Sequence, residues 1–269
     1  TANVITGDIT ATPASTPDVD PSVENNLKNV VINASQDFVL EGDLVFSSVS
    51  DDARFDATND DAATVTLEIN GEADVTIQQI DVTDPDIDTL VINNAGTGTL
   101  TVTGASPAIN GDGGELETLT LEGTGDIVFG TDGEGITSAT VSTIDASALS
   151  GDLTLGEVTD VDSADFAFTA GSGVTTMTLT SDVLDADVNA DPAESGWSID
   201  YTNAAEGSEL RLGEDLDFTA GPLSINMGAN GTLYIDADTD LTALDLTLLG
   251  DQPIVVADGV ELTLTAAQA

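Results

Sequence analysis

Closely spaced carboxylates are the most frequent residues in this sequence that could take part in chemistry. They fall into four clusters: Asp84, Asp86 and Asp88; Asp160, Asp162 and Asp165; Asp182, Asp185, Asp187, Asn189 and Asp191; and Asp236, Asp238 and Asp240. Ca²⁺ takes about six to eight oxygen ligands from carboxylates, amide side chains and backbone carbonyls, and a loop with this spacing presents several of them together. The clusters therefore predict calcium as a bound cofactor.

A solvated acidic loop has the same spacing, so both interpretations of each cluster stay open. An EF-hand loop needs glycine at its sixth position, and Leu241 and Pro192 stand there in the fourth and third clusters. The pattern indicates an oxygen-only cation site of no specific motif.

Several other chemistries lack the residues that they require. The chain has no histidine and no cysteine, which excludes a Ser-His-Asp triad, a thiol nucleophile and a zinc-thiolate site. Acidic pairs suited to glycoside hydrolysis would occur by chance among 50 carboxylates, so they indicate nothing. Polysaccharide lyases generally need a positioned Arg or Lys, and Arg211 is the sole plausible candidate for that role in this chain. We predict that the protein is not an enzyme.

The net charge of −47 limits the possible partners. Only Lys28, Arg54 and Arg211 offset the carboxylates, whereas nucleic-acid binding needs clusters of basic residues. The polyanion also repels anionic membranes, and no apolar run is long enough to span a bilayer, so no membrane insertion is expected. A chain with this much self-repulsion requires high salt or bound divalent cations in order to fold compactly. The acidity therefore reflects either salt adaptation or calcium binding.

Short alternating runs of apolar and polar residues must position the acidic turns. Leu119-Thr-Leu121 and Leu153-Thr-Leu155 are examples, and such runs recur roughly every 11 residues with Gly and Asp between them. This pattern predicts an all-β fold: a β-solenoid resembling a parallel β-helix, with antiparallel hairpins where Asn-Gly pairs occur at Asn70 and Asn230. A β-sandwich is the alternative. Asp126, Asp132 and Asp152 then lie at corners, where they could meet cations or a neighbouring subunit.

Composition divides the chain into four parts. Residues 1–26 combine a β-branched strand with a Pro-rich linker, and such a strand is suited to adding to the sheet edge of a neighbouring molecule. Residues 27–181 form a β-rich body, residues 182–197 are an acidic insertion or boundary, and residues 198–269 are a β-rich C-terminal section.

Two segments, Thr143–Leu155 and Val256–Ala269, resemble stretches of large bacterial S-layer, RTX-type and adhesin surface proteins. The resemblance implies a secreted, largely β-structured and often calcium-dependent protein at the cell surface. The RTX nonapeptide itself is absent, because Glu115 and Glu117 replace its Gly and Asp, so no calcium ligand is carried over.

We therefore expect an extracellular, self-assembling subunit of an S-layer, filament or biofilm matrix, with copies of itself and divalent cations as partners. The alternative is an adhesin module that binds a cell-surface glycan or another surface protein. A glycan platform would draw on Trp197, Tyr201 and Tyr234, which are the only Trp and Tyr residues of the chain.

Overall fold

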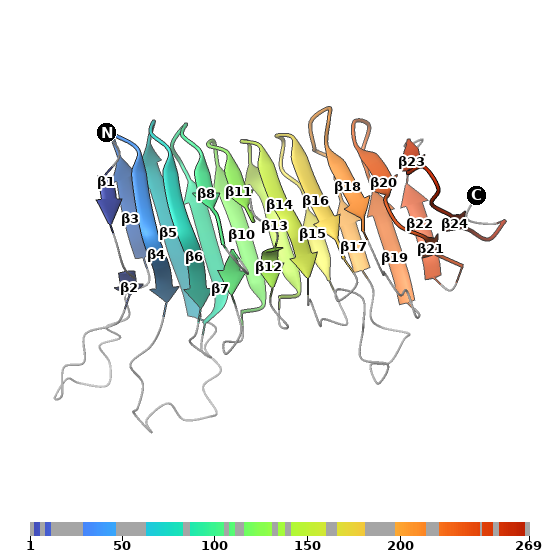
Figure 1. Cartoon of the computed structure of the whole chain (residues 1–269), viewed down its shortest axis with the longest axis horizontal. Helices are drawn as coiled ribbons and strands as arrows, with labels where there is room; N and C mark the ends of the chain where they lie inside the picture. Colours follow the sequence, from blue (N-terminus) through green and yellow to red (C-terminus); the bar gives the residue numbers. More distant parts are fainter. Residues whose placement is uncertain are drawn as a thin grey trace, which may run out of the picture.

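The computed structural model describes 14 segments of the chain: residues 3–5, 9–11, 29–46, 63–82, 87–104, 108–110, 116–130, 134–137, 141–159, 166–180, 197–213, 221–242, 244–249 and 253–266. Strands joined by turns and bends make up this part of the chain, and none of it is helical. The strands lie side by side in an elongated stack, with the two termini at opposite ends (Figure 1).

Two large sheets run the length of this stack. The main path of sheet A is β1 (Asn3–Ile5), β4 (Phe38–Phe46), β6 (Val75–Val82), β8 (Leu100–Val102), β11 (Ile127–Phe129), β14 (Leu153–Thr159), β16 (Thr175–Leu179), β18 (Glu209–Leu212), β20 (Thr232–Ile235) and β23 (Ile254–Val256). Sheet B runs through β3 (Asn29–Ala34), β5 (Ala63–Gly71), β7 (Ile87–Asn94), β10 (Thr118–Gly123), β13 (Thr143–Leu149), β15 (Ala167–Thr169), β17 (Trp197–Asp200), β19 (Gly221–Asn226) and β22 (Leu244–Leu249).

Shorter strands continue the layers of sheet A. They are β2 (Ile9–Ala11), β9 (Ile109–Asn110) and β12 (Glu134–Thr137), and two more, β21 (Thr239–Asp240) and β24 (Leu262–Thr263), pair with each other. A sheet B strand followed by a sheet A strand thus makes one coil of the chain.

The chain is a β-solenoid, as the sequence predicts. Successive coils place Val75, Leu100, Ile127 and Leu153 next to one another in sheet A, at separations of 25, 27 and 26 residues. Two strands per coil account for the spacing of roughly 11 residues between apolar runs. Direct strand neighbours are therefore distant in sequence, as in other solenoids, where each repeat packs on the next.

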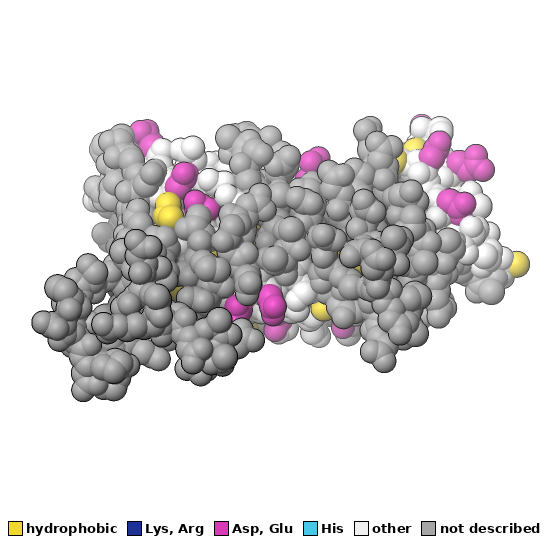
Figure 2. Space-filling model, turned by 90° about the horizontal axis from the view of Figure 1, so that it is seen from below, with side chains coloured by type: hydrophobic (Ala, Val, Ile, Leu, Met, Phe, Trp, Pro, Cys, Tyr) yellow, Lys and Arg dark blue, Asp and Glu magenta, His cyan; other side chains and the backbone are white. Residues whose placement is uncertain are grey.

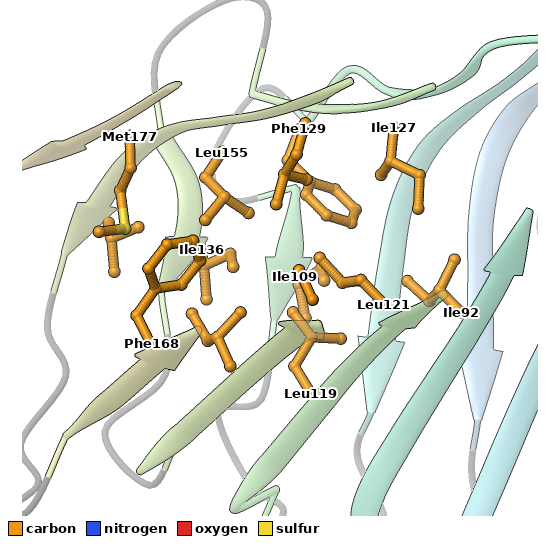
Figure 3. Packing of buried hydrophobic residues seen from close by; sticks show 14 of the residues in the cluster. Ile92, Ile109, Leu119, Leu121, Ile127, Phe129, Ile136, Leu155, Phe168 and Met177 are labelled. Atoms are coloured by element: carbon orange, nitrogen blue, oxygen red, sulfur yellow. The ribbon is translucent and has the colours of Figure 1, made fainter. Parts of the chain in front are cut away.

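The core lies between the two sheets and is continuous along the stack. Alternate side chains of each strand point inward, and the register aligns them in columns. One column in sheet B consists of Val65, Leu90, Leu119, Ile144, Phe168, Ile199 and Ile225, all of them buried. Figure 3 shows how Leu119, Leu121 and Ile92 from sheet B approach Ile127 and Phe129 from sheet A. Threonines occupy many outward positions, such as Thr89, Thr118 and Thr143.

The antiparallel hairpins expected at the Asn-Gly pairs are not formed. Every strand pair among the described residues is parallel. Gly71, with a φ of 122°, ends β5, and the next strand, β6, belongs to the other sheet. Asn230-Gly231 likewise lies between β19 of sheet B and β20 of sheet A. Each pair turns the chain from one sheet to the other, which is a different use of the same turn residues.

A column of glycines lines the turns that lead from sheet B to sheet A. Gly98, Gly125, Gly151 and Gly173 each stand two residues before the next sheet A position. A Cβ at Gly151 would lie 2.2 Å from the carbonyl oxygen of Gly125, and one at Gly173 would lie 2.1 Å from that of Gly151. Only glycine lets the turns of neighbouring coils stack at the distance that the sheets impose. We call these turns the glycine corner.

The stack continues across the acidic segment that was expected to be an insertion or a boundary. Residues 181–196 lie outside the described residues. On its two sides, β15 pairs with β17 in sheet B and β16 pairs with β18 in sheet A.

Candidate functional site

Aspartates at the glycine corner bind the backbone of the next coil. The Asp126 carboxylate accepts a hydrogen bond of 2.8 Å from the backbone N–H of Asp152, and Asp152 accepts one of 2.8 Å from Val174. Asp74 accepts the same bond from Thr99 at 2.9 Å. These side chains therefore satisfy backbone donors between coils. The sequence suggested that Asp126 and Asp152 would meet cations or a neighbouring subunit, and Asp132, the third corner residue, lies outside the described residues.

The fourth acidic cluster is described in full, and each of its carboxylates has a different partner. Asp236 accepts a hydrogen bond of 2.9 Å from Arg211, and Asp238 accepts one of 2.8 Å from the backbone N–H of Glu261. Asp240 accepts hydrogen bonds from the hydroxyl of Thr242 and, with a smaller effect, from its backbone N–H, and these bonds hold the pKa of Asp240 below its ordinary value.

The other predicted calcium ligands fall mostly outside the described part of the chain. Asp88 lies near the start of β7, is half-buried, and accepts a bond from the backbone N–H of Glu117 through its carbonyl oxygen. The residues outside are Asp84, Asp86, Asp160, Asp162, Asp165, Asp182, Asp185, Asp187, Asn189 and Asp191. Within the described segments, no three Asp or Glu side chains come close enough to hold a metal ion. Calcium binding stays a prediction.

Two buried polar groups have no counterpart in the sequence analysis. Asn94 is 1% exposed, and its side-chain amide donates bonds of 2.9 Å to the carbonyl oxygens of Gly98 and Asp126. Asp81 has one carboxylate oxygen that is buried without a hydrogen-bond partner among the described residues. Desolvation, followed by the charge of Asp43, raises the pKa of Asp81. In the sequence, the Asn93-Asn94 pair at the end of a strand is the feature that could have indicated the buried amide of Asn94.

All of the aromatic residues suited to a glycan platform are engaged inside the protein or by other side chains. Trp197 packs against Phe166 with ring centroids 4.8 Å apart, and Tyr201 is fully buried. Tyr234 is half-buried, and the Arg211 guanidinium lies 4.2 Å from the centre of its ring. A flat, exposed aromatic surface is therefore not available from the Trp and Tyr side chains.

Acidic side chains dominate the visible charge. On the face shown in Figure 2, the described charged side chains are Asp and Glu, spread over several parts of the stack. Arg211 is held by Glu209 and Asp236 at 2.8 and 2.9 Å.

The C-terminal end of the stack leaves inward-facing side chains uncovered. Ile254 and Val256 in β23 are 38% and 39% exposed. Their direct neighbours one coil earlier, Leu233 and Ile235, are 2% and 0% exposed. The positions are equivalent, so the difference arises because no further strand covers β23 in the described part of the chain. Nothing in the local sequence of β23 shows that its inward face lacks a neighbour.

The N-terminal end is covered on one sheet only. β1 and β2 both pair with β4, on the edge opposite to β6, and Leu40, Leu44 and Phe46 of β4 are buried. In sheet B, no strand of the described part of the chain covers β3 in this way, and Val30 and Ile32 are only partly buried. The N-terminal strand that we expected to add to a neighbouring molecule thus pairs with its own chain.

A comparison of the sequence and structure with known protein families, curated proteins and solved structures finds no match. Among the described residues, no helix has the length and apolar character needed to cross a membrane.

Proposed function

We propose that this protein is a non-enzymatic structural subunit of the bacterial cell surface or extracellular matrix. It joins copies of itself end to end into a filament, S-layer or biofilm matrix, and calcium stabilises the assembled form. The uncovered ends of the stack carry the proposal.

The distribution of exposed apolar side chains supports end-to-end contact over lateral contact. The large hydrophobic residues that are exposed in the described part of the chain are Val31, Ile254, Val255 and Val256. All four belong to β3 and β23, which end sheet B and sheet A in the described part of the chain. Ile254 and Val256 face inward, whereas Val31 and Val255 lie on the outer faces of their strands, beside Glu68 and Tyr234. Uncovered strand edges also present unpaired N–H and C=O groups, which favour pairing with another chain.

The polarity of the strands fits a head-to-tail arrangement. Because the strand pairs are parallel throughout the stack, the edge at one end matches the edge at the other in direction. A contact between two different ends leaves one of each free, so it propagates into an open filament.

The net charge of the chain is the reason for including calcium in the proposal. Copies that each carry −47 repel one another, and cations must screen or bridge the carboxylates before the ends can meet. Extracellular calcium sites bind at roughly 10⁻⁴ to 10⁻³ M, a concentration range common outside cells. The acidic clusters at Asp160–Asp165 and Asp182–Asp191 are the proposed ligands, together with Asp84, Asp86 and Asp88.

Negative-stain electron microscopy of the purified chain tests this function. Samples contain calcium, calcium followed by excess chelator, or the same ionic strength of NaCl. We expect filaments with calcium that dissolve on chelation. A chain that stays monomeric under all three conditions would show that the proposal is wrong, and filaments in NaCl alone would show that calcium has no specific role.

A pair of matched variants tests the contact surface. Val256→Lys places a charge on the inward side of the terminal strand, and we expect it to abolish filaments. Thr154→Lys adds the same charge to an exposed outward position in β14, in the middle of the stack. Loss of assembly in Thr154→Lys with full assembly in Val256→Lys would indicate lateral contact instead.

A further inference from the structure

The two ends of the stack differ by one layer of sheet A. In the described part of the chain, the main path of sheet A has ten strands, from β1 to β23, whereas sheet B has nine, from β3 to β22. At the C-terminal end, β22 and β23 belong to one coil, so the two sheets end level. At the N-terminal end, β3 and β4 belong to one coil, and β1 and β2 lie one layer beyond them. We call these two strands the N-terminal cap.

The extra layer prevents both sheets from continuing into a second copy. Strands in either sheet are about 4.7–4.9 Å apart, so a level end placed on the capped end meets β1 in sheet A first. In sheet B, β22 would then be separated from β3 of the second copy by the width of one strand, because no described strand of sheet B lies level with β1. That space lies over Val30 and Ile32, which stay only partly buried.

Without the N-terminal cap, both ends are level. β23 then meets β4 of the next copy, and β22 meets β3, so both sheets continue with parallel pairing. Along the register of sheet A, the inward residues Ile254 and Val256 belong to the columns that begin with Leu40 and Leu44. In the capped chain, Leu40 and Leu44 are instead the register partners of Ile5 and Ile9.

From this difference in layers we propose that the N-terminal cap is a removable cover that blocks self-assembly until it leaves β4. The partner is a second copy of this chain, whose β22 and β23 edges replace the cap. This inference rests on the proposed end-to-end assembly and adds its regulation. The cap consists of two strands of three residues each, and in the described part of the chain no sheet B strand lies opposite them, so the cap lacks the facing strand that the other layers of sheet A have.

A reversible crosslink provides the sharpest test. Val4 and Val39 are direct register partners in β1 and β4, and neighbouring strands lie within the Cα separation that a disulfide allows. The chain has no cysteine, so the double variant Val4→Cys, Val39→Cys forms one defined bond. We expect the oxidised variant to form no filaments in calcium, and the same sample to assemble like the wild type after reduction.

Two further measurements keep the test decisive if the disulfide forms poorly. A chain lacking residues 1–11 should assemble at a lower protein concentration and with a shorter lag than the full chain, and its fibres should diffract at the strand spacing of about 4.8 Å. Hydrogen exchange should show that β1 and β2 lose protection when the wild-type chain assembles.

The possible outcomes separate the two proposals. If the oxidised variant assembles as well as the reduced one, or if β1 and β2 stay protected in filaments, the cap does not regulate assembly, while the proposed function stands. If the folded truncated chain assembles no better than the full chain, the cap inference is also wrong. If neither the wild type nor the truncated chain assembles at any calcium concentration, both proposals fail.

Discussion

The carboxylate of Asp126 accepts a hydrogen bond from the backbone N–H of Asp152, its counterpart one coil later, at 2.8 Å. Asp152 repeats this contact with Val174, so each carboxylate at the glycine corner holds the next turn in place. Because these donors lie between coils and outside the sheet ladders, the acidic side chains stabilise the stacking itself.

Removal of the Asp126 acceptor should lower the free energy of unfolding. We expect Asp126→Ala to cost about 1 kcal/mol, the usual net value of one such bond. Asp126→Asn is the matched control, since it removes the charge and retains an acceptor oxygen. Urea unfolding in high salt, where the loss of one negative charge matters least, measures the difference. Equal stability of the Ala and Asn variants would contradict the bond's role.

A methyl group at the glycine corner should be far more costly than one on an open turn. Gly151→Ala places its Cβ against the Gly125 carbonyl, and we expect a loss of about 3 kcal/mol because the backbone on both sides must move. In Gly207→Ala, nothing lies within 4 Å, and the strain comes only from a φ of 95°, for about 1 kcal/mol. Thermal unfolding compares the two variants, and the reverse order would refute close stacking at the corner.

Asp81 should make stability depend on pH in the acidic range. Burial and Asp43 raise the pKa of Asp81 in the folded state, so its charged form lowers stability at neutral pH. This cost is relieved as the pH falls through the raised pKa, and it is absent below the unfolded value of about 3.9. We expect Asp81→Asn to be more stable than the wild type at pH 7, with a gain that shrinks on acidification.

The general relief of negative charge must be separated from this effect. Glu72→Gln removes one charge at an exposed position and serves as the control in the same denaturant series. If the two variants gain equally at pH 7 and follow the same pH course, the burial of Asp81 has no energetic effect.

Tyr201 should lower stability at alkaline pH. Complete burial raises the pKa of Tyr201 well above its usual value of about 10. Above pH 10 the unfolded chain loses this proton while the folded chain keeps it, so unfolding becomes more favourable as pH rises. Relative to Tyr201→Phe, the wild type should lose about 1.4 kcal/mol per pH unit above pH 10.

The Tyr201→Phe variant keeps the ring and removes only the hydroxyl. This removal should cost little by itself, because the hydroxyl makes only a long hydrogen bond of 3.4 Å to the Glu209 carbonyl oxygen. Denaturant unfolding between pH 8 and 12 measures the two slopes. Parallel slopes would show that the hydroxyl reaches solvent in the folded protein.

Fold class could be predicted from the sequence because the inward pattern repeats in every coil. Leu119, Leu121, Leu153 and Leu155 alternate with polar residues, and all four are buried. Pairing direction could not be predicted so well. Asn70-Gly71 specifies a local turn with positive φ, but the strand that pairs with β5 lies one coil away and is chosen by packing between coils.

The acidic residues were the least predictable feature. Asp-x-Asp spacing in Asp236, Asp238 and Asp240 suggests a shared cation, yet these side chains bind Arg211, a backbone N–H and Thr242 separately. The chain bends at Ala237, between Asp236 and Asp238, and two of the three partners, Arg211 and the backbone N–H of Glu261, come from neighbouring coils. Sequence spacing alone contains neither piece of information.

The continuous column from Val65 to Ile225 has a consequence for how the molecule can vary in size. Each coil contacts only the coils on either side, so the duplication or loss of one coil changes a single junction and leaves the remaining contacts as they are. Such a protein can lengthen or shorten in steps of one strand spacing while its two ends, and therefore whatever they bind, stay the same.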